Sequence, residues 1–289
     1  MPIRKAIIPV AGFGTRFLPA AKAQPKEMLA VVDKPVIQYI VEEVVASGIE
    51  EVIFVTSYGK RALEDHFDRN FELEYRLEQK NKLKELEQIS AIGKLAKFAF
   101  VRQAKPLGDG HALLSALPFV GEDESVAVVF GDAIFDAKDP GIKQMLSTYE
   151  EHNAPVIGLL EVPKDEVSRY GVVGGEMISK SVIKIDKFVE KPKPEEAPSN
   201  LIAPGYYIIT PKIMRILESQ TPGKDGEIRL ADAFATALNE GVDLYGKVIS
   251  GTWLDCGNKL GFLKAQVQLG MKHPEVGDDF KKYLEELLK

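Results

Sequence analysis

Cysteine is nearly absent from this sequence of 289 residues, in which Cys256 is the only one. A single cysteine forms no disulfide within the chain, and no cysteine and histidine stand at the spacing of a zinc site. Long apolar stretches are missing as well, because the run at 6–10 already contains Pro9 and is too short for a signal peptide or a membrane helix. We therefore expect a cytoplasmic protein with no membrane partner.

Basic residues are outnumbered by acidic ones, since 37 lysines and arginines face 43 aspartates and glutamates, a formal net charge of −6. This balance argues against a nucleic-acid-binding protein, which needs an excess of cations. An acidic protein that handles anions must gather cations at one place, from side chains or a bound metal. With 45% apolar and 28% charged residues, the chain fits one large α/β domain or two small ones.

Three short apolar runs have the continuous hydrophobicity of strands buried on both faces of a parallel sheet: 6–10, 52–56 and 126–130. Between the first two, residues 35–45 repeat apolar side chains at helical spacing, with Gly48 beyond the end. A strand, a helix and a second strand in this order predict a right-handed βαβ unit. The sequence therefore predicts an α/β fold.

The composition changes along the rest of the chain. Residues 72–97 are rich in Glu, Lys and Leu, which predicts an exposed helical insertion before a strand at 98–101. Beyond residue 160, shorter apolar runs and many prolines predict a β-rich subdomain that grows on the sheet without a linker. The last apolar residues lie on one face of a helix that docks either on its own domain or on a second subunit: Phe280, Tyr283, Leu284, Leu287 and Leu288.

A glycine-containing loop follows the first predicted strand, with Gly12 and Gly14 placed to let the backbone approach a phosphate. Phe17 stands where a dinucleotide fingerprint needs its third glycine, and the chain contains no Walker sequence. Cations follow within the same loop: Arg16, Lys22 and Lys26. The loop suits a triphosphate, whose charge must be spread over several donors, although a tight turn with solvated cations is the alternative for this segment alone.

Two aspartates from distant parts of the sequence follow apolar strands, Asp132 after 126–130 and Asp255 after 251–254. Ligands of open α/β sheets bind at the carboxyl ends of the strands. Mg²⁺ takes one or two carboxylates together with phosphate oxygens and water, so the pair is a candidate metal site. Capping or turn formation is the alternative for each aspartate on its own.

Several other side chains have two interpretations, one as a chemical group of the site and one as a structural residue. Glu190 and Lys191 either form a surface ion pair or bind the hydroxyls and phosphate of a sugar phosphate. Gln103 carries a donor and an acceptor and is able to read a pyrimidine edge. We interpret Cys256 as a small buried thiol and not a nucleophile. The four histidines are interpreted as structural, with His111 as support for its loop: His66, His111, His152 and His273.

These segments together resemble the signature of the sugar-1-phosphate nucleotidylyltransferases, most closely that of the bacterial UTP–glucose-1-phosphate uridylyltransferases. The resemblance extends over nearly the whole chain in one order: 11–19, 25–29, 33–35, 102–103, 108–112, 170–173, 190–192, 197–200 and 255–259. It implies a Rossmann-like, three-layer αβα nucleotide-diphospho-sugar transferase fold, with a mostly parallel mixed central sheet and a small β-rich sugar-binding subdomain.

The resemblance also implies a reaction and roles for single residues. A uridylyl group would pass from UTP to α-D-glucose 1-phosphate with Mg²⁺ as cofactor, held by Asp132 and Asp255. Arg16, Lys26 and Lys191 would be catalytic. The sugar phosphate would contact Gly171, Glu190 and Lys191. The nucleotide would contact Ala11, Gly12, Gly14, Thr15, Glu27, Gln103 and Gly108.

We expect one catalytic domain over 1–256, with a nucleotide-binding part at about 1–135 and a sugar-phosphate part at about 136–256. The segment 257–289 would form a C-terminal helical contact in a homodimer or homotetramer, by analogy with the family. Ala133 and residues 104–107 differ from the family pattern. A different nucleotide, dTTP or CTP, or a different sugar 1-phosphate is therefore an alternative substrate. A catalytically silent nucleotide-sugar-binding regulator and, less favoured, a dinucleotide-dependent dehydrogenase are the alternatives of another class.

Overall fold

The computed structural model describes residues 2–223 and 225–289 of the chain. Its strands are β1 Lys5–Pro9, β2 Ala30–Val31, β3 Lys34–Pro35, β4 Glu51–Thr56, β5 Lys97–Arg102, β6 Val126–Val129, β7 Ala133–Asp136, β8 Val156–Glu161, β9 Gly171–Met177, β10 Val182–Glu190, β11 Leu201–Ala203, β12 Tyr206–Ile209, β13 Leu244–Val248 and β14 Thr252–Asp255. The predicted strands at 6–10, 52–56 and 126–130 correspond to β1, β4 and β6.

The helices are α1 Val36–Ala46, α2 Arg61–Phe67, α3 Phe71–Gln79, α4 Leu83–Ile92, α5 Asp109–Ala116, α6 Gly141–His152, α7 Pro211–Ser219, α8 Leu230–Asn239, α9 Lys259–Gly270 and α10 Gly277–Leu287. Short 3-10 turns occur at Thr15–Phe17, Ala20–Lys22, Lys26–Met28, Leu117–Phe119 and Val167–Arg169. The predicted helix at 35–45 is α1, and Pro35 precedes its first turn.

One sheet of ten strands runs through the described residues in the order β11-β9-β10-β13-β8-β12-β6-β1-β4-β5. From β6 to β5 all neighbours are parallel, as the βαβ prediction requires. The prediction of a mixed sheet is confirmed, but parallel pairing dominates only in this half. In the other half only β13 and β8 are parallel, because strands joined by short connections, such as β9 and β10, pair in opposite directions.

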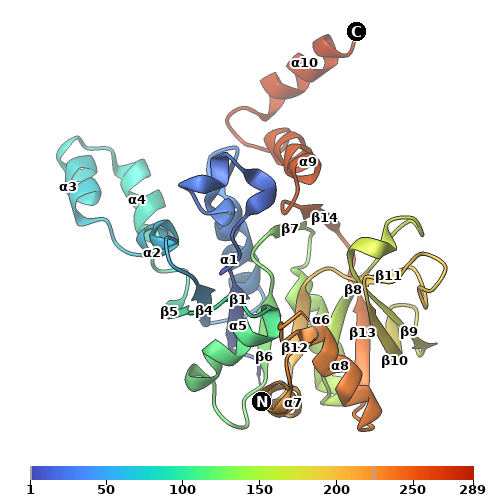
Figure 1. The fold of residues 1–289 in the computed structure, drawn as a ribbon. Helices are drawn as coiled ribbons and strands as arrows, with labels where there is room; N and C mark the ends of the chain where they lie inside the picture. Colours follow the sequence, from blue (N-terminus) through green and yellow to red (C-terminus); the bar gives the residue numbers. More distant parts are fainter. Residues whose placement is uncertain (1, 224) are drawn as a thin grey trace.

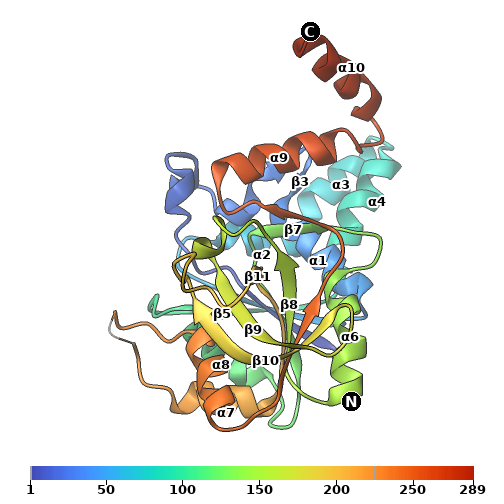
Figure 2. The same ribbon diagram turned by 90° about the vertical axis from the view of Figure 1, so that its right-hand side faces the viewer.

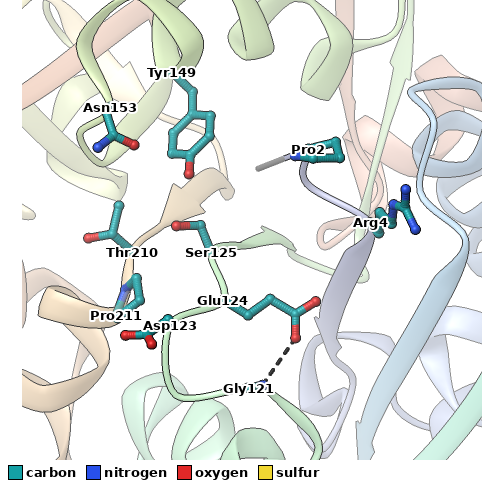
Figure 3. Close-up of a pocket in the computed structure, with 10 residues that line it drawn as sticks. All are labelled: Pro2, Arg4, Gly121, Asp123, Glu124, Ser125, Tyr149, Asn153, Thr210 and Pro211. Atoms are coloured by element: carbon teal, nitrogen blue, oxygen red, sulfur yellow. Dashed lines mark hydrogen bonds between the residues drawn. The ribbon is translucent and has the colours of Figure 1, made fainter.

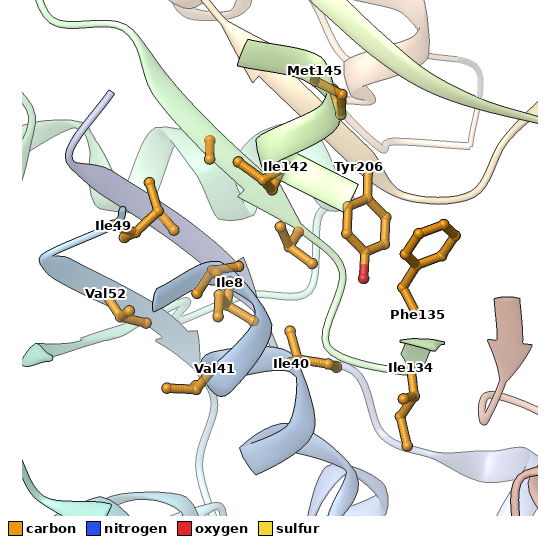
Figure 4. Close-up of a cluster of buried hydrophobic side chains, with 14 of the residues drawn as sticks. Ile8, Ile40, Val41, Ile49, Val52, Ile134, Phe135, Ile142, Met145 and Tyr206 are labelled. Carbon is orange, nitrogen blue, oxygen red and sulfur yellow. The ribbon is translucent and has the colours of Figure 1, made fainter. Parts of the chain in front are cut away.

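Helices cover both faces of the sheet, which confirms the three layers (Figures 1 and 2). Ile8 packs toward α1 and α6, while its neighbour Ile7 points to the other face and joins the side chains of α5, α7 and α8. Figure 4 shows part of the cluster that contains Ile8, in which Phe135 lies next to Tyr206 and to which Ile40 of α1 and Ile142 of α6 also belong. Burial of each such isoleucine stabilises the fold by roughly 1.5–3 kcal/mol.

The charged segment 72–97 forms α3 and α4, a helical hairpin that lies to one side of the sheet (Figure 1). Its apolar residue Leu83 is exposed, as expected for an insertion. The β-rich part of the chain contributes β9, β10 and β11 to the same ten-stranded sheet as β1, β4 and β6. No separate linker lies between these two groups of strands in the described residues.

The C-terminal segment forms α9 and α10. Gln266 of α9 accepts a hydrogen bond from the backbone of Val32 and donates one to the carbonyl of Ala30, so α9 is fixed to the N-terminal half. Both ribbon views show α10 projecting away from the rest of the molecule (Figures 1 and 2). Within the described residues, no helix is both long and apolar enough to cross a membrane.

Candidate active site

The parallel strands β1, β4, β5 and β6 end at one edge of the sheet, and four loops therefore meet there. These loops carry the glycines at 12 and 14, Lys60, Gln103 and Asp132. Open α/β sheets bind ligands at this edge because the chain diverges on either side and leaves a crevice. A cleft of about 280 Å³ lies here and is lined by seven of the predicted residues: Ala11, Gly12, Lys26, Glu27, Gln103, Gly108 and Asp132.

The glycine loop is an open turn followed by short 3-10 segments. Gly14 has φ of +64°, in the left-handed region that favours glycine, and a Cβ there would press on Lys26. Thr15 and Arg16 are exposed, and Arg16 is near enough to Lys26 for its charge to act on that ammonium. Phe17 packs edge-on against Phe262 of α9, so the loop is anchored from the C-terminal segment.

Lys26 is the most firmly held cation of this loop, since its Nζ lies 2.6 Å from Asp132 Oδ2. Burial lowers the pKa of Lys26, but the carboxylates of Asp132 and Glu27 outweigh burial and leave the pKa above its ordinary value. The ammonium therefore stays protonated at neutral pH. It lies between the glycine loop and the end of β6, where a phosphate held by either would meet it.

Glu27 forms a buried ion pair that the sequence did not reveal. Its carboxylate oxygens lie 2.8 and 3.0 Å from Lys60 Nζ, and both side chains are almost fully buried. Burial outweighs the partner's charge for each group, raising the pKa of Glu27 and lowering that of Lys60. Lys60 follows β4 at the same end of the parallel strands as the other loops. This position after a predicted strand is the sequence feature that indicates Lys60 as a residue of the site.

Asp132 and Asp255 come together although 123 positions separate them. The antiparallel pairing of β7 with β14 places Asp255 opposite Ala133, directly after Asp132. A Cβ on Gly257 would lie 2.9 Å from Asp132 Oδ2 and 3.0 Å from Asp255 Oδ1, so both carboxylates border the same small space.

The Asp255 carboxylate is held by neighbours of its own. Asn258 Nδ2 donates to Asp255 Oδ2 at 2.7 Å, while its Oδ1 caps α9 by accepting from the Gly261 amide. Tyr170 and Arg169 approach the same Oδ2 at 3.3 and 3.4 Å. The sequence reading missed all three contacts, although Tyr170 and Asn258 lie inside the matched segments.

Among the residues predicted to bind the sugar phosphate, Gly171 begins β9, Glu190 ends β10 and Lys191 follows β10. Glu190 pairs with Gly171 across these strands, and Lys191 Nζ lies 2.9 Å from Glu190 Oε1. Lys191 itself has φ of +48°, a strained conformation for a lysine, and its amide donates to the carbonyl of Tyr170. Because Tyr170 also contacts Asp255, this cluster is continuous with the pair of aspartates.

Gln103 and Gly108, which are predicted to bind the nucleotide, contact each other in the cleft. Gln103 is buried and follows β5, and Gly108 has φ of +98° with the Ile228 carbonyl where a Cβ would stand. Asp109 accepts from the amides of Gly110 and Leu230, tying this loop to α8. Burial raises the pKa of the Asp109 carboxyl, and the negative charge of nearby Glu190 raises it further.

Contacts therefore connect the glycine loop, the two aspartates and the segment at Tyr170 and Lys191. Arg16 is the least constrained of the predicted site residues, as an exposed side chain beside Lys26. Cys256 is buried, and burial raises the pKa of its thiol to about 12, which agrees with a structural thiol. The roles of the site residues in binding and catalysis remain predictions.

A second cavity, of about 730 Å³, lies at the opposite end of the sheet, near the start of β1 and of β6 (Figure 3). Arg4, Glu124 and Tyr149 line it, and none of the predicted residues does. Its lining includes two neighbouring carboxylates, Asp123 and Glu124, and none of the cations predicted to bind phosphates.

An α/β sheet whose carboxyl edge gathers a glycine loop, cations and two facing carboxylates defines an enzyme that handles nucleotide phosphates. Residues 5–271 match the nucleotidyl transferase family, and the chain belongs to that family.

Three comparisons narrow this further. The chain is 46% identical over 290 residues to UTP–glucose-1-phosphate uridylyltransferase 2 of Streptococcus pyogenes serotype M3, covering 99% of this chain and 96% of the relative. A solved structure of a UTP-bound UGPase from Acinetobacter baumannii has a TM-score of 0.92 and 43% identity, covering 99% of this chain and 100% of the other. A UDP-glucose pyrophosphorylase complexed with UDP-glucose has a TM-score of 0.85 and 39% identity, covering 94% and 100%.

These similarities confirm the resemblance that the sequence segments indicated, and they make the chain a nucleotidyltransferase enzyme. They also remove support for a dinucleotide-dependent dehydrogenase, which Phe17 already disfavoured. The predicted fold is confirmed, except that antiparallel pairing dominates in the part of the sheet from β11 to β6.

Proposed function

We propose that this chain transfers the uridylyl group of UTP to α-D-glucose 1-phosphate and releases UDP-glucose and pyrophosphate. Two sets of contacts meet at one small space beside Gly257, and this observation carries the proposal. Lys26 contacts Asp132 on the proposed nucleotide side, and Asp255 contacts Tyr170, which accepts from the Lys191 amide on the proposed sugar-phosphate side. The names of the relatives and structural neighbours support the same substrates.

A phosphate oxygen of glucose 1-phosphate attacks the α-phosphorus of UTP in line. One P–O bond forms, the bond from the α-phosphorus to the bridging oxygen breaks, and its electron pair leaves with pyrophosphate. Two anions must come within about 3–3.5 Å for this step. At about 4 Å and an effective dielectric near 20, each pair of unit charges repels by about 4 kcal/mol, so the protein must supply positive charge and orientation.

The chain's own cations meet this need from two directions. Arg16 and Lys26 lie on the glycine loop, where the triphosphate is bound, and Lys191 lies at the end of β10, where it neutralises the sugar phosphate. The amides of Ala11, Gly12, Gly14 and Thr15 cradle the phosphates, and buried Glu27 fixes the position of its neighbour Lys26. No protein nucleophile is required.

The residues at the two aspartates fit a magnesium ion. Two carboxylates border one small space against Gly257, where any side chain would intrude. In the described residues no group of three or more His, Cys, Asp or Glu side chains is placed to hold a metal, which agrees with an ion that completes its shell from phosphate oxygens and water. Asp132 and Asp255 would hold it, and when bound it supplies positive charge to the phosphates.

Specific contacts complete the substrate sites. Gln103 and Gly108 bind the uracil and ribose, while Gly171 and Glu190 bind the glucosyl hydroxyls beside Lys191. A Cβ on Gly171 would stand 2.5 Å from the Phe188 ring and 3.1 Å from Glu190 Oε2, so glycine is required for the close packing of Phe188 beside that carboxylate.

We further propose a cytoplasmic homodimer or homotetramer with α10 in a subunit contact. Tyr283, Leu287 and Leu288 are exposed on α10, whereas Phe280 packs on Gly270. An exposed apolar face on a projecting helix favours a partner of the same kind. Light scattering of the full chain and of a Leu287→Glu variant tests this, and an unchanged mass in the variant would remove α10 from the contact.

The reaction is tested with UTP, dTTP and CTP against several sugar 1-phosphates in the presence of Mg²⁺, by measuring pyrophosphate release. We expect the highest kcat/KM with UTP and glucose 1-phosphate. Preference for another pair would change the substrates and keep the chemistry. Nucleotide-sugar binding without pyrophosphate release from any pair would favour a silent regulator.

A further inference from the structure

The side chain of Gln103 is held by two groups that both take its amide hydrogens. Gln103 Nε2 lies 3.0 Å from the carbonyl oxygen of Gly108 and 3.1 Å from Nδ1 of His111. A carbonyl oxygen only accepts hydrogen bonds, so the amide nitrogen of Gln103 must face Gly108. Chemistry therefore decides which way this amide points.

The second amide hydrogen then reaches His111 on the first turn of α5. For Nδ1 to accept it, the His111 ring must be neutral with its proton on Nε2. The position of His111 is itself fixed, because its amide donates to the Ile228 carbonyl and its carbonyl accepts from the Ser115 hydroxyl. His111 thus presents a fixed acceptor to Gln103.

With both amide hydrogens engaged, the oxygen of Gln103 remains for a ligand. In the described parts of the chain, Gln103 Oε1 takes part in no hydrogen bond, and it is not one of the fully buried polar atoms that lack a partner. The Gln103 side chain and Gly108 both line the cleft. The ligand atom that meets Gln103 there must therefore be a donor.

We infer that His111 is a positioning residue that sets base selectivity by locking the Gln103 amide with its oxygen toward the nucleotide. This inference rests on the proposed function of the cleft as the UTP site. Uracil and thymine carry an N3–H donor, whereas cytosine carries a bare N3 acceptor at the same place. The locked oxygen attracts the first two bases and repels the third. A glutamine free to rotate would accept either edge.

The test compares the wild-type protein with His111→Leu, His111→Phe and His111→Asn. The first two remove the acceptor, and His111→Phe also keeps the ring shape should the leucine variant fail to fold. Asparagine places an oxygen acceptor close to the position of Nδ1. For each protein, equilibrium dissociation constants of UTP, dTTP and CTP are measured with Mg²⁺ and without sugar phosphate.

We expect His111→Leu and His111→Phe to reduce the preference for UTP over CTP about tenfold, the effect of losing one well-placed hydrogen bond. The ratio of UTP to dTTP should not move, because both bases carry N3–H. His111→Asn should restore most of the preference. Introducing His111→Leu into a Gln103→Leu background should change the UTP to CTP ratio no further, since His111 acts through Gln103.

Two results would overturn the inference. A wild-type protein that binds UTP and CTP equally lacks the selectivity that His111 is proposed to set. A His111→Leu variant that weakens UTP and CTP by the same factor gives His111 only a supporting role in its loop. Binding is measured without sugar phosphate and therefore does not depend on the reaction. A wild-type protein that prefers UTP to CTP but releases no pyrophosphate would contradict the proposed reaction, while the inference about His111 would still hold.

Discussion

The ammonium of Lys26 lies 2.6 Å from the carboxylate of Asp132, across 106 positions of sequence. This contact joins the glycine loop after β1 to the end of β6, and it keeps a cation between the backbone proposed to bind the triphosphate and the proposed metal ligands. The proposed chemistry depends on that position more than on any other single charge.

Lys26→Ala should lower kcat/KM by about 10²–10³-fold, comparable to the loss of one preorganised donor to a developing charge. Pyrophosphate release at saturating glucose 1-phosphate measures it. Lys138→Ala, which removes an exposed lysine, serves as the control and should leave the rate unchanged. Equal rates in both variants would remove Lys26 from catalysis.

Asp132→Asn and Asp255→Asn should each abolish most Mg²⁺-dependent activity, because each removes a negative oxygen ligand from a site with only two carboxylates. Chelation should stop the wild-type reaction, and added Mg²⁺ should restore it. The measurement is the Mg²⁺ concentration that gives half-maximal rate, with Asp186→Asn as an exposed control. An unchanged metal requirement in both variants would discard this ligand assignment.

Lys191→Ala should raise KM for glucose 1-phosphate and depress kcat, with the dissociation constant of UTP little changed, because Lys191 is proposed to neutralise the sugar phosphate and not the nucleotide. Lys193→Ala is a matched control, since Lys193 pairs only with exposed Glu196. Steady-state kinetics and UTP titration together test this. A variant that loses UTP affinity and keeps its KM for the sugar phosphate would contradict the assignment.

Lys60→Met should destabilise the fold by about 3–5 kcal/mol, because it leaves the Glu27 carboxylate buried without a partner. The double variant Lys60→Met/Glu27→Leu should recover much of that loss. Urea unfolding gives the free energies. As a control, Arg76→Met breaks an exposed pair with Glu72 and should cost less than about 1 kcal/mol. Similar losses for both single variants would mean that the Lys60 pair behaves like a surface pair.

The buried carboxyl of Glu43 should make stability depend on pH. Burial raises its pKa from 4.5 to about 7, although the amide of Ile142 donates to it at 3.2 Å and opposes the shift. The folded chain therefore holds this proton more tightly than the unfolded chain. Stability is greatest below about pH 4.5 and falls as pH rises through 7, by about 3 kcal/mol from this group.

Glu43→Gln should remove this dependence. The variant should resemble the wild type near pH 5 and exceed it in stability above pH 7, where the wild-type carboxyl must ionise in the core. Unfolding curves at several pH values measure the difference, with exposed Glu122→Gln as the control. A wild-type protein whose stability rises from pH 5 to pH 8 relative to Glu43→Gln would show that the carboxyl is ionised in the fold.

Local sequence was a good guide to the elements. The runs at β1, β4 and β6 are apolar throughout because both faces of these strands are covered, and that pattern is visible without coordinates. The glycine loop, the two aspartates and the cations were recognisable because their types match phosphate chemistry and their segments matched a family in order.

Contacts between distant residues were not recognisable in this way. In the sequence, Lys60 is one of many lysines. The pairing of β4 with β1 brings the Lys60 ammonium to the Glu27 carboxylate, and the sequence does not show this contact. His111 looked like loop support until its Nδ1 was found against Gln103. The sheet was correctly predicted to be mixed, but the extent of its antiparallel pairing was not, because strand direction depends on which strands become neighbours and not on the strands themselves.

The sequence by itself determined which segments become strands and helices, and which residue types are available to bind phosphates, since both follow from hydrophobic spacing and side-chain chemistry. Only the tertiary structure decided that Asp132 meets Asp255, that Lys60 neutralises Glu27 and that His111 orients Gln103. Pairing of β7 with β14 and the shared edge of the parallel strands bring these groups together, and such long-range pairings leave no local signal in the chain.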